Sequence, residues 1–252
     1  MIILVFFDPT DISMTGGFDA VRPPQTWVSS TGLLAVSWSN DAVHDLDGSP
    51  ATNHAITTTM SSHRAAEFAI GRVCARTAIQ TLGGRHENLE RLPDGSVAWP
   101  NGWTGSITHT RRVVIACVAR TTLLHGIGVD LEPNLPLPEA SSLALAKDCF
   151  VGPAAELQAE GSRVGFSARE AAFKALSSIQ RLVPILSMTV TVMMETQDGG
   201  QFVVSIPGAS VDHVEGRWWL VAESFLLTAA IVRERDVSPY SSSDEGAPGS
   251  SL

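Results

Sequence analysis

The spacing of apolar residues changes several times in the first half of the chain, and each change predicts a different element. An apolar run at residues 2–7 predicts a strand. Residues 8–60 are rich in Asp, Ser, Thr, Gly and Pro, which indicates loops around one short strand at 33–38. Across residues 61–84, apolar positions recur every three or four residues up to a glycine pair, as in an amphipathic helix. A second apolar run, at 113–119, predicts another strand.

The second half repeats this succession of strands and helices. The pattern predicts a strand at 126–132, helices at 143–150 and 167–177, and strands at 188–194, 201–206 and 218–232. An Asp-Gly-Gly turn at 198–200 joins the first two of these last three strands as a hairpin. We therefore expect an α+β fold of two similar α/β subdomains, residues 1–122 and 123–235. The segment 236–252 has no apolar period, and we expect it to be a disordered tail.

Composition places the chain among folded, soluble proteins. Hydrophobic residues make up 44% and charged residues 17% of the 252 positions. No apolar run approaches the roughly 20 residues needed to cross a bilayer, so we expect no membrane association. The cysteines at 74, 117 and 149 lack a CxxC spacing and have apolar neighbours, which predicts mostly buried, reduced thiols in a cytoplasmic protein.

The net charge of -9 argues against nucleic acid or an anionic membrane surface as a partner. The charge is unevenly distributed along the chain. Residues 1–63 hold one base and six acids, whereas residues 64–112 hold seven bases and four acids and are net +3. A local basic surface can attract phosphate groups even when the whole chain is acidic.

Residues 126–132, GIGVDLE, carry the strongest local signal for chemistry. On a strand, the three apolar residues face one way, while Gly128, Asp130 and Glu132 face the other. The two carboxylates would then lie about 6.5 to 7 Å apart, beside a glycine that leaves room for a ligand. Such a pair suits Mg²⁺, which binds through one or two carboxylates and completes its shell with water and phosphate oxygens. The alternative is a half-exposed strand whose acids face water.

A second segment, FSAREAAFK at 166–174, contains an acid and one of only two lysines in the chain. Ser167 followed by Glu170 fits a helix capping box, in which the glutamate would serve only the helix backbone. Lys174 lies four residues after Glu170, so the two could form a solvated ion pair on one helix face. These structural interpretations stay open beside a role in a reaction.

GIGVDLE followed downstream by FSAREAAFK resembles the paired signature of 4'-phosphopantetheinyl transferases of the Sfp/EntD type. Upstream, HRAAEF, GRVCAR and WPNGWTGSITHT are similar to the other blocks of the EntD-like branch, in the same order, so the resemblance covers about residues 63–176. It implies transfer of the phosphopantetheine arm of coenzyme A to a serine of an apo acyl or peptidyl carrier protein, with Mg²⁺ as cofactor and 3',5'-ADP as product. It also implies service to nonribosomal peptide or polyketide synthases in secondary metabolism.

The resemblance further implies roles for individual residues of the second half. Asp130 and Glu132 match the metal-binding acids of the family, and Glu170 matches a third acid that could also deprotonate the incoming serine. Lys174 matches a lysine near the phosphates, where a cation offsets charge on the leaving oxygen. The choice of base between Glu170 and Lys174 stays open. Arg169 stands where the family usually has lysine, and its wide guanidinium is not equivalent to a compact ammonium.

Residues upstream would bind the rest of coenzyme A. By resemblance, Arg64 and Arg72 hold the 3'-phosphate and neighbouring groups, and Arg91 stands where relatives often have a basic residue. The planar fork of arginine suits phosphate oxygens. His109 matches a histidine that touches the phosphates, and Thr108 could donate a hydroxyl. Outside the motif, each arginine would be an ordinary surface cation and the histidine a structural one.

The length of the chain, 252 residues, favours one kind of family member. It is similar to the fused, pseudo-dimeric enzymes, which work as monomers with a site between their halves, and not to the half-sized holo-acyl-carrier-protein synthases, which build sites between subunits. Two other classes compete. A Mg²⁺-dependent phosphohydrolase or nuclease would also use clustered acids, but it does not predict the upstream arginines. A non-catalytic coenzyme-binding or carrier-binding module would not need the acids and the lysine.

Overall fold

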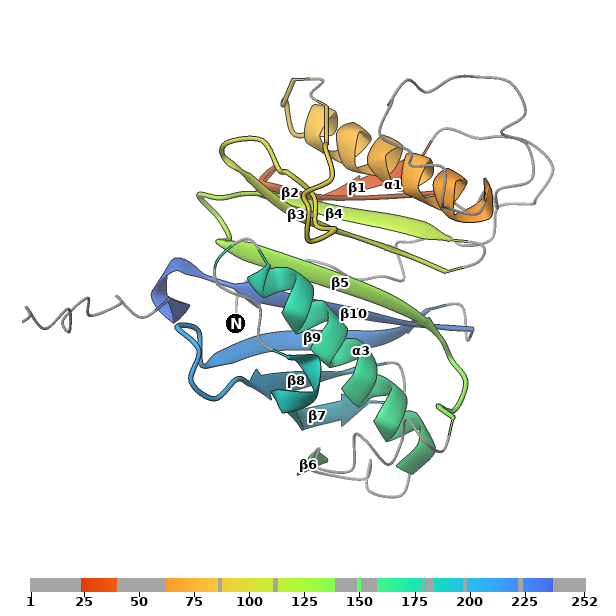
Figure 1. Ribbon diagram of the computed structural model, residues 1–252, viewed down its shortest axis with the longest axis vertical. Helices are drawn as coiled ribbons and strands as arrows, with labels where there is room; N and C mark the ends of the chain where they lie inside the picture. The colour runs from red at the N-terminus through yellow and green to blue at the C-terminus, as the bar shows by residue number, and fades with distance from the viewer. Residues whose placement is uncertain are drawn as a thin grey trace, which may run out of the picture.

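Two units, each a sheet with one long helix packed on it, make up the protein in this computed structural model (Figure 1). The structure describes residues 24–39, 62–85, 88–110, 113–138, 149–150, 158–177, 179, 184–196, 199–221 and 224–237. The predicted strand at 2–7 lies outside these ranges, as does the predicted tail beyond residue 237. Asp236, which that prediction assigns to the tail, ends a short 3₁₀ helix, Glu234–Asp236.

The first unit is a four-stranded antiparallel sheet that carries helix α1. Its strands lie in the order β1-β2-β4-β3 and comprise Gln25–Val28 (β1), Leu34–Ser39 (β2), Trp103–His109 (β3) and Val114–Arg120 (β4). Helix α1, Ser62–Thr81, confirms the helical period found at 61–84. Strands β2 and β4 confirm the predictions at 33–38 and 113–119. The apolar pattern misses β1, in which no residue is fully buried.

Small side chains let α1 pack closely on the middle of this sheet. The buried cluster between them includes the small residues Cys74, Ala75, Ala78 and Ala116, together with Ile79 and Val118. The helix ends at a glycine in the left-handed region, since Gly83 has a φ of 77°. As predicted, Cys74 and Cys117 are buried free thiols, and burial raises the pKa of each to about 12.

The second unit is a six-stranded sheet in the order β5-β10-β9-β8-β7-β6, in which only the β6–β7 pair is parallel. Its strands are Gly126–Pro133 (β5), Cys149–Phe150 (β6), Thr189–Thr196 (β7), Gly199–Ser205 (β8), His213–Val221 (β9) and Phe225–Val232 (β10). Helix α3, Gln158–Leu176, packs on β5 and β10. The strands predicted at 126–132, 188–194 and 201–206 are confirmed, and β7 and β8 pair as the predicted antiparallel hairpin.

Three predictions for this unit need correction. The single strand predicted at 218–232 is two antiparallel strands, because both faces of the sheet are buried there and the apolar pattern does not mark the turn. The helix predicted at 143–150 is wrong at its end, where Cys149 and Phe150 pair with β7; its other residues lie outside the described ranges. Helix α3 begins at Gln158, so Ser167 lies inside the helix and cannot cap it.

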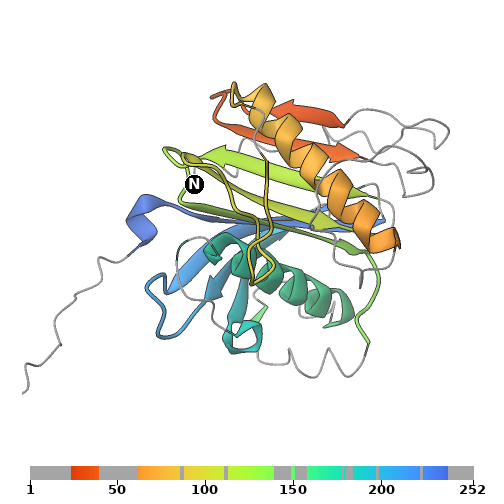
Figure 2. The ribbon, with the colours of Figure 1, turned by 45° about the horizontal axis from the view of Figure 1, so that its top comes forward.

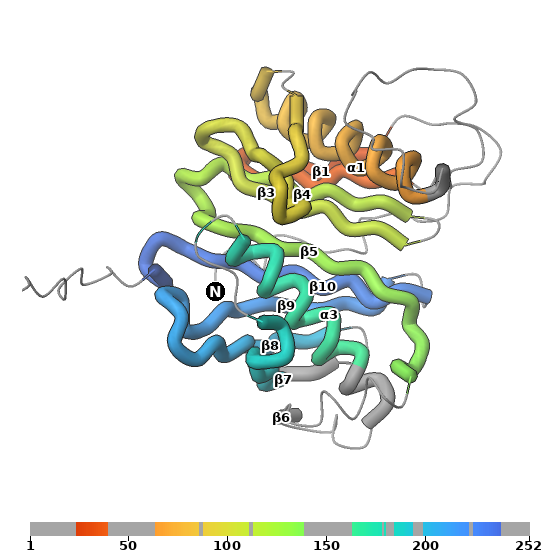
Figure 3. Tube along the Cα trace, in the orientation of Figure 1, coloured from red at the N-terminus to blue at the C-terminus, as the bar shows by residue number. Residues whose placement is uncertain are grey.

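A shared apolar core joins the two units. It is built from alternating residues of β2, β4, β5, β9 and β10, including Ile127, Val129 and Leu131, as the alternation on β5 predicts. The edge strands β3 and β5 also meet directly: the N–H groups of Val129 and Leu131 donate to the hydroxyls of Ser106 (3.0 Å) and Thr108 (3.1 Å). Figures 2 and 3 show β5 running along the boundary between the two units. The expected fold of two α/β subdomains in a pseudo-dimeric arrangement is confirmed, while the division at residue 122 stays a prediction.

None of the described helices is long and apolar enough to cross a membrane.

Candidate active site

A cavity of about 520 Å³ lies where the two units meet. Its walls come from α1, the loop before β3, β3 itself and α3. Six of the nine residues predicted for the site line it: Arg64, Arg72, Arg91, His109, Glu170 and Lys174. The other three, Thr108, Asp130 and Glu132, do not line it. The cavity therefore brings cations of the first unit to the same space as an acid and a lysine of the second.

Asp130 lies behind the cavity wall and is nearly fully buried. Its Oδ1 accepts hydrogen bonds from Lys174 Nζ (2.7 Å) and Thr108 Oγ1 (3.4 Å). Its Oδ2 accepts from Ser167 Oγ (2.9 Å). Because both carboxylate oxygens have donors from the protein, the side chain is held in one orientation.

Lys174 stands between this buried carboxylate and the cavity. Its ammonium donates to Asp130 and, at 3.1 Å, to the backbone oxygen of Val129. The ion pair of Lys174 is thus with Asp130 and not with Glu170, which corrects the interpretation of a solvated i,i+4 pair. In both of these contacts Lys174 is the hydrogen-bond donor.

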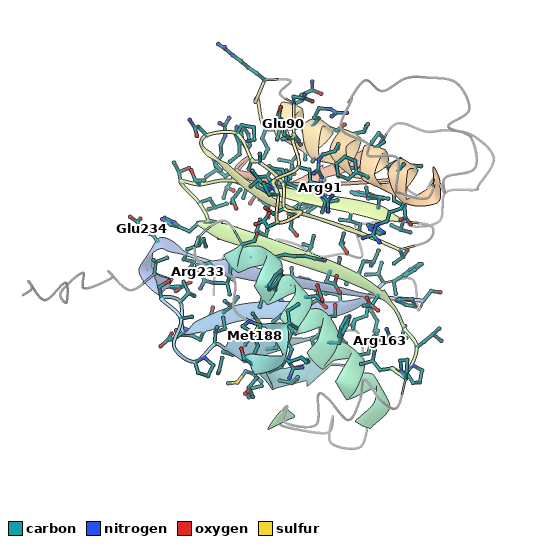
Figure 4. All side chains as sticks on the ribbon, viewed as in Figure 1. Glu90, Arg91, Arg163, Met188, Arg233 and Glu234 are labelled. Carbon is teal, nitrogen blue, oxygen red and sulfur yellow. The ribbon has the colours of Figure 1, made fainter. Side chains whose placement is uncertain are left out.

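Glu132 lies on the same face of β5 as Asp130, and it pairs with Arg163 of α3. Arg163 Nη1 lies 2.6 Å from Glu132 Oε2, and the same guanidinium donates to the backbone oxygens of Leu135 (2.8 Å) and Pro136 (3.0 Å). Burial, together with the negative charge of Asp130, raises the pKa of Glu132, while Arg163 opposes this shift. Figure 4 shows Arg163 near the beginning of α3, in the second unit.

Glu170 is a half-buried carboxyl in the cavity wall. Burial raises its pKa; the positive charge of Lys174 opposes the rise, and the negative charge of Asp130 adds to it. Carboxylates of β5 and α3 therefore lie close enough to disfavour one another's charged forms, a conflict that a divalent cation would relieve. Within the described ranges, no three His, Cys, Asp or Glu side chains are grouped tightly enough to hold a metal ion by themselves. A cation here would need further oxygen ligands, such as those of a phosphate.

The opposite wall of the cavity is rich in arginine. Arg72 is buried, donates to the backbone oxygen of Leu89 (2.9 Å) and lies 4.3 Å from the centre of the Phe68 ring. Burial, together with the positive charges of Arg76 and Arg91, lowers its pKa to about 10. Arginines crowded in this way favour an anion between them. A negative group offsets both the free-energy cost of burying their charge and their mutual repulsion.

His109 ends β3 at the rim of this arginine-rich wall. Its Nδ1 lies 3.4 Å from Oε2 of Glu67, a buried acid of α1 that also lines the cavity. The pattern of the sequence does not single out Glu67. The only sign is its place in HRAAEF, three residues after Arg64 on the same helix face.

Comparison with known proteins identifies this arrangement. The model of the 4'-phosphopantetheinyl transferase N-terminal domain matches residues 52–119. The chain is 34% identical over 195 residues to 4'-phosphopantetheinyl transferase Svp of Streptomyces mobaraensis. The matched region covers 73% of this chain and 76% of that protein. The chain belongs to the 4'-phosphopantetheinyl transferase family. It is also 28% identical, over 178 residues, to 4'-phosphopantetheinyl transferase PptT of Mycobacterium tuberculosis, covering 66% of this chain and 78% of that protein.

As a 4'-phosphopantetheinyl transferase, the enzyme acts with coenzyme A on carrier proteins. Thr108 is expected to offer its hydroxyl to coenzyme A, but it does not line the cavity of the transferase. It is buried, and its hydroxyl accepts from Leu131 N and donates to Asp130, so it serves the contact between the units and is not presented to a ligand in the cavity.

The prediction made for Gly128 also needs correction. The expectation that this glycine leaves room for a ligand is wrong, because α3 fills that space. A Cβ on Gly128 would overlap the backbone oxygen of Ala171 and lie 2.6 Å from the nitrogen of Ala175. The glycine instead lets the helix of the transferase approach β5 closely, which brings Lys174 to Asp130.

Arg169, the departure from the family pattern, is fully buried on the other side of α3. It donates to the backbone oxygens of Met188 (3.0 Å) and Gly165 (3.2 Å). It does not line the cavity of the transferase. In this enzyme the residue ties α3 to the segment before β7, a role for which a guanidinium with several donors is suited.

Proposed function

We propose that this transferase moves the 4'-phosphopantetheine group of coenzyme A to a serine of an apo acyl or peptidyl carrier protein in a Mg²⁺-dependent reaction that releases 3',5'-ADP. The observation that carries the proposal is that arginines of the first unit line the same cavity as Glu170 and Lys174 of the second. We further propose that the enzyme is a cytoplasmic monomer of the EntD-like branch that serves nonribosomal peptide or polyketide synthases in secondary metabolism.

The acids of β5 and α3 fit a magnesium ion by their chemistry. Asp130, Glu132 and Glu170 offer only hard oxygen ligands. The pKa values of the two glutamates are raised by burial and, to a smaller extent, by the negative charge of Asp130. These residues would hold the ion, with phosphate oxygens of coenzyme A completing its shell. When bound, Mg²⁺ neutralises charge on the pyrophosphate and orients it.

The residues of the first unit would bind the nucleotide portion of coenzyme A. Arg64, Arg72 and Arg91 line the cavity as the cations for its phosphates, and His109 extends this set at the end of β3. Binding through these groups places the pyrophosphate beside Lys174. Residues 1–122 would thus form the coenzyme-binding subdomain and residues 123–235 the metal-binding, catalytic one.

The choice of base follows from the hydrogen bonds of Lys174. Because its ammonium donates to Asp130 and to Val129 O, we assign it to the phosphates and not to proton abstraction. Glu170, whose pKa is raised by burial, takes the proton of the serine hydroxyl. The serine oxygen forms the new bond to phosphorus as the bond to the 3',5'-ADP oxygen breaks, and Lys174 offsets the charge that gathers on that leaving oxygen.

The test is an incubation of the enzyme with coenzyme A, Mg²⁺ and a panel of apo carriers of fatty acid, polyketide and peptide synthesis. Mass spectrometry of each carrier should show the gain of one phosphopantetheine group, and chelation of the metal should stop it. Coenzyme A binding without any gain across the panel would favour a binding module. Modification of the fatty acid carrier alone would contradict the proposed role in secondary metabolism.

A further inference from the structure

Three buried hydroxyls surround Asp130, and the transfer mechanism above uses none of them. Ser167 and Thr228 are fully buried, and Thr108 is nearly so. They come from three separate elements: α3, β10 and β3. Polar groups at such depth are costly unless each is hydrogen-bonded, so their grouping around one carboxylate calls for a reason.

The direction of the hydrogen bonds follows from counting protons. A serine hydroxyl has one proton, and that of Ser167 goes to Asp130 Oδ2 at 2.9 Å, since an ionised carboxylate only accepts. The contact of 2.7 Å between Ser167 Oγ and Thr228 Oγ1 must therefore be donated by Thr228. The result is a directed pair of hydrogen bonds, from Thr228 to Ser167 and from Ser167 to Asp130, which we call the hydroxyl relay.

The relay connects the helix to the sheet at one point. Thr228 lies directly across from Asp130 in the antiparallel β10–β5 pair, so the two are fixed relative to each other by the backbone. Ser167 belongs to α3, which also carries Glu170 and Lys174. A displacement of α3 along β5 would break the relay, and an intact relay keeps the carboxylate of Asp130 in register with the reactive residues of the helix.

We propose that Ser167 and Thr228 are positioning residues for the metal site: they fix the Asp130 carboxylate in the orientation that binds the divalent cation. The proposal rests on the proposed function, in which Asp130 is a metal ligand. Partners behind a metal ligand commonly change metal affinity or activity by 10–100-fold when they are removed. Thr228 acts only through Ser167, so its effect should be smaller and should not add to that of Ser167.

The experiment measures binding of Mn²⁺, used as a probe for the metal, to the full-length enzyme saturated with coenzyme A by electron paramagnetic resonance. A mixture of Mn²⁺ and coenzyme A alone is the blank, because the site takes phosphate oxygens in addition to its carboxylates. Ser167→Ala should weaken Mn²⁺ binding by about tenfold or more, and Thr228→Val by about threefold, with the double variant no weaker than Ser167→Ala. Ser37→Ala is the matched control, because Ser37 is a fully buried serine of β2 that is bonded to Thr26 and not to an acid. This control should bind Mn²⁺ like the wild type. A merely structural role for Ser167 would lower the melting temperature of both serine variants and leave both metal affinities unchanged.

A folded Ser167→Ala variant with wild-type Mn²⁺ affinity overturns the positioning role of the relay. Should that variant fail to fold, Thr228→Val and the near-isosteric Ser167→Cys decide the matter by the same measurement, since the thiol is a weaker donor that should give intermediate affinity. A wild-type enzyme that binds no Mn²⁺ at Asp130, shown by an unchanged signal in Asp130→Asn, overturns the proposed metal site and the relay together. Normal Mn²⁺ binding by the wild type and by both relay variants overturns the relay alone.

Discussion

The two units of the enzyme share one plan, a long helix on an antiparallel sheet, but they place their charged residues in different ways. The first unit presents arginines to a cavity, where Arg64 is exposed and Arg72 has backbone and ring contacts. The second holds Asp130 and Glu132 in direct contact with cations and hydroxyls of α3. Asp130 and Glu132 are thus fixed by charged and hydroxyl partners, whereas Arg64 of the first unit lies at the surface. The following predictions test this difference.

The largest effect is expected for Asp130→Asn, which keeps the shape of the side chain and removes its charge. Loss of the carboxylate removes a proposed metal ligand and the charge partner of Lys174. We expect turnover to fall by about 1,000-fold, equivalent to about 4 kcal/mol, in a carrier-mass assay at saturating coenzyme A. The melting temperature serves as the control for folding. Turnover within tenfold of the wild type would exclude Asp130 from the metal site.

The helix–strand contacts of the two units should differ in their tolerance of a methyl group. Gly128→Ala would drive a Cβ into the backbone of α3, which cannot move aside, so we expect a loss of about 3 kcal/mol in the free energy of unfolding. The matched change in the first unit is Gly71→Ala, whose Cβ would lie 2.8 Å from the side-chain Cγ2 of Ile107. That contact is with a side chain and not with backbone, but Cγ2 belongs to a β-branched residue that turns little about its first side-chain bond. Since alanine also favours the helix by about 1 kcal/mol, we expect a loss of only about 1 kcal/mol. Chemical denaturation of both variants checks this, and equal losses would refute the difference.

Arg72→Gln should impair binding more than chemistry. The guanidinium lines the cavity and lies among other cations, and hydrogen bonds to charged groups contribute about 1.5–3 kcal/mol. We expect KM for coenzyme A to rise by about 10- to 100-fold, with kcat reduced less than threefold. Since Arg72 also donates to Leu89 O, the assay should be run well below the melting temperature of the variant. A fall in kcat with KM unchanged would place Arg72 among the groups that act on the transition state.

The smallest effect is expected for Arg64→Gln at the exposed edge of the cavity. A solvated cation contributes at most about 1 kcal/mol, so KM for coenzyme A should rise by only two- to fivefold. Salt screens such charges, and the difference from the wild type should disappear at about 0.5 M NaCl. Steady-state kinetics at two salt concentrations check this, and an effect that persists at high salt would show a direct, desolvated contact.

Much of the site could be predicted because its determinants are local in sequence. The alternation along β5 separates the apolar core residues from Asp130 and Glu132, and the helical period places Glu170 and Lys174 one turn apart. The rest depends on partners distant in the chain. Ser167 resembles a helix cap until the helix is seen to start nine residues earlier at Gln158, and its true partners, Asp130 and Thr228, are 37 and 61 residues away.

The same limit explains the errors in the second sheet. The strand predicted at 218–232 is apolar on both faces, so its reversal between Val221 and Phe225 leaves no mark in the hydrophobic pattern. The space assigned to a ligand beside Gly128 belongs to the backbone of α3. Neither the packing of a helix backbone on a strand nor the contact of two sheet edges can be deduced from the spacing of residues along one segment.

The hydroxyls of Ser106 and Thr108 that accept the N–H groups of Val129 and Leu131 also bear on solubility. An edge strand with free backbone donors is a template for pairing with another chain, and natural sheets cover or blunt such edges. Here each unit covers the exposed border of the other through side chains, with no continuous backbone ladder between them. Packing two similar units edge to edge in one chain therefore covers an edge strand of each.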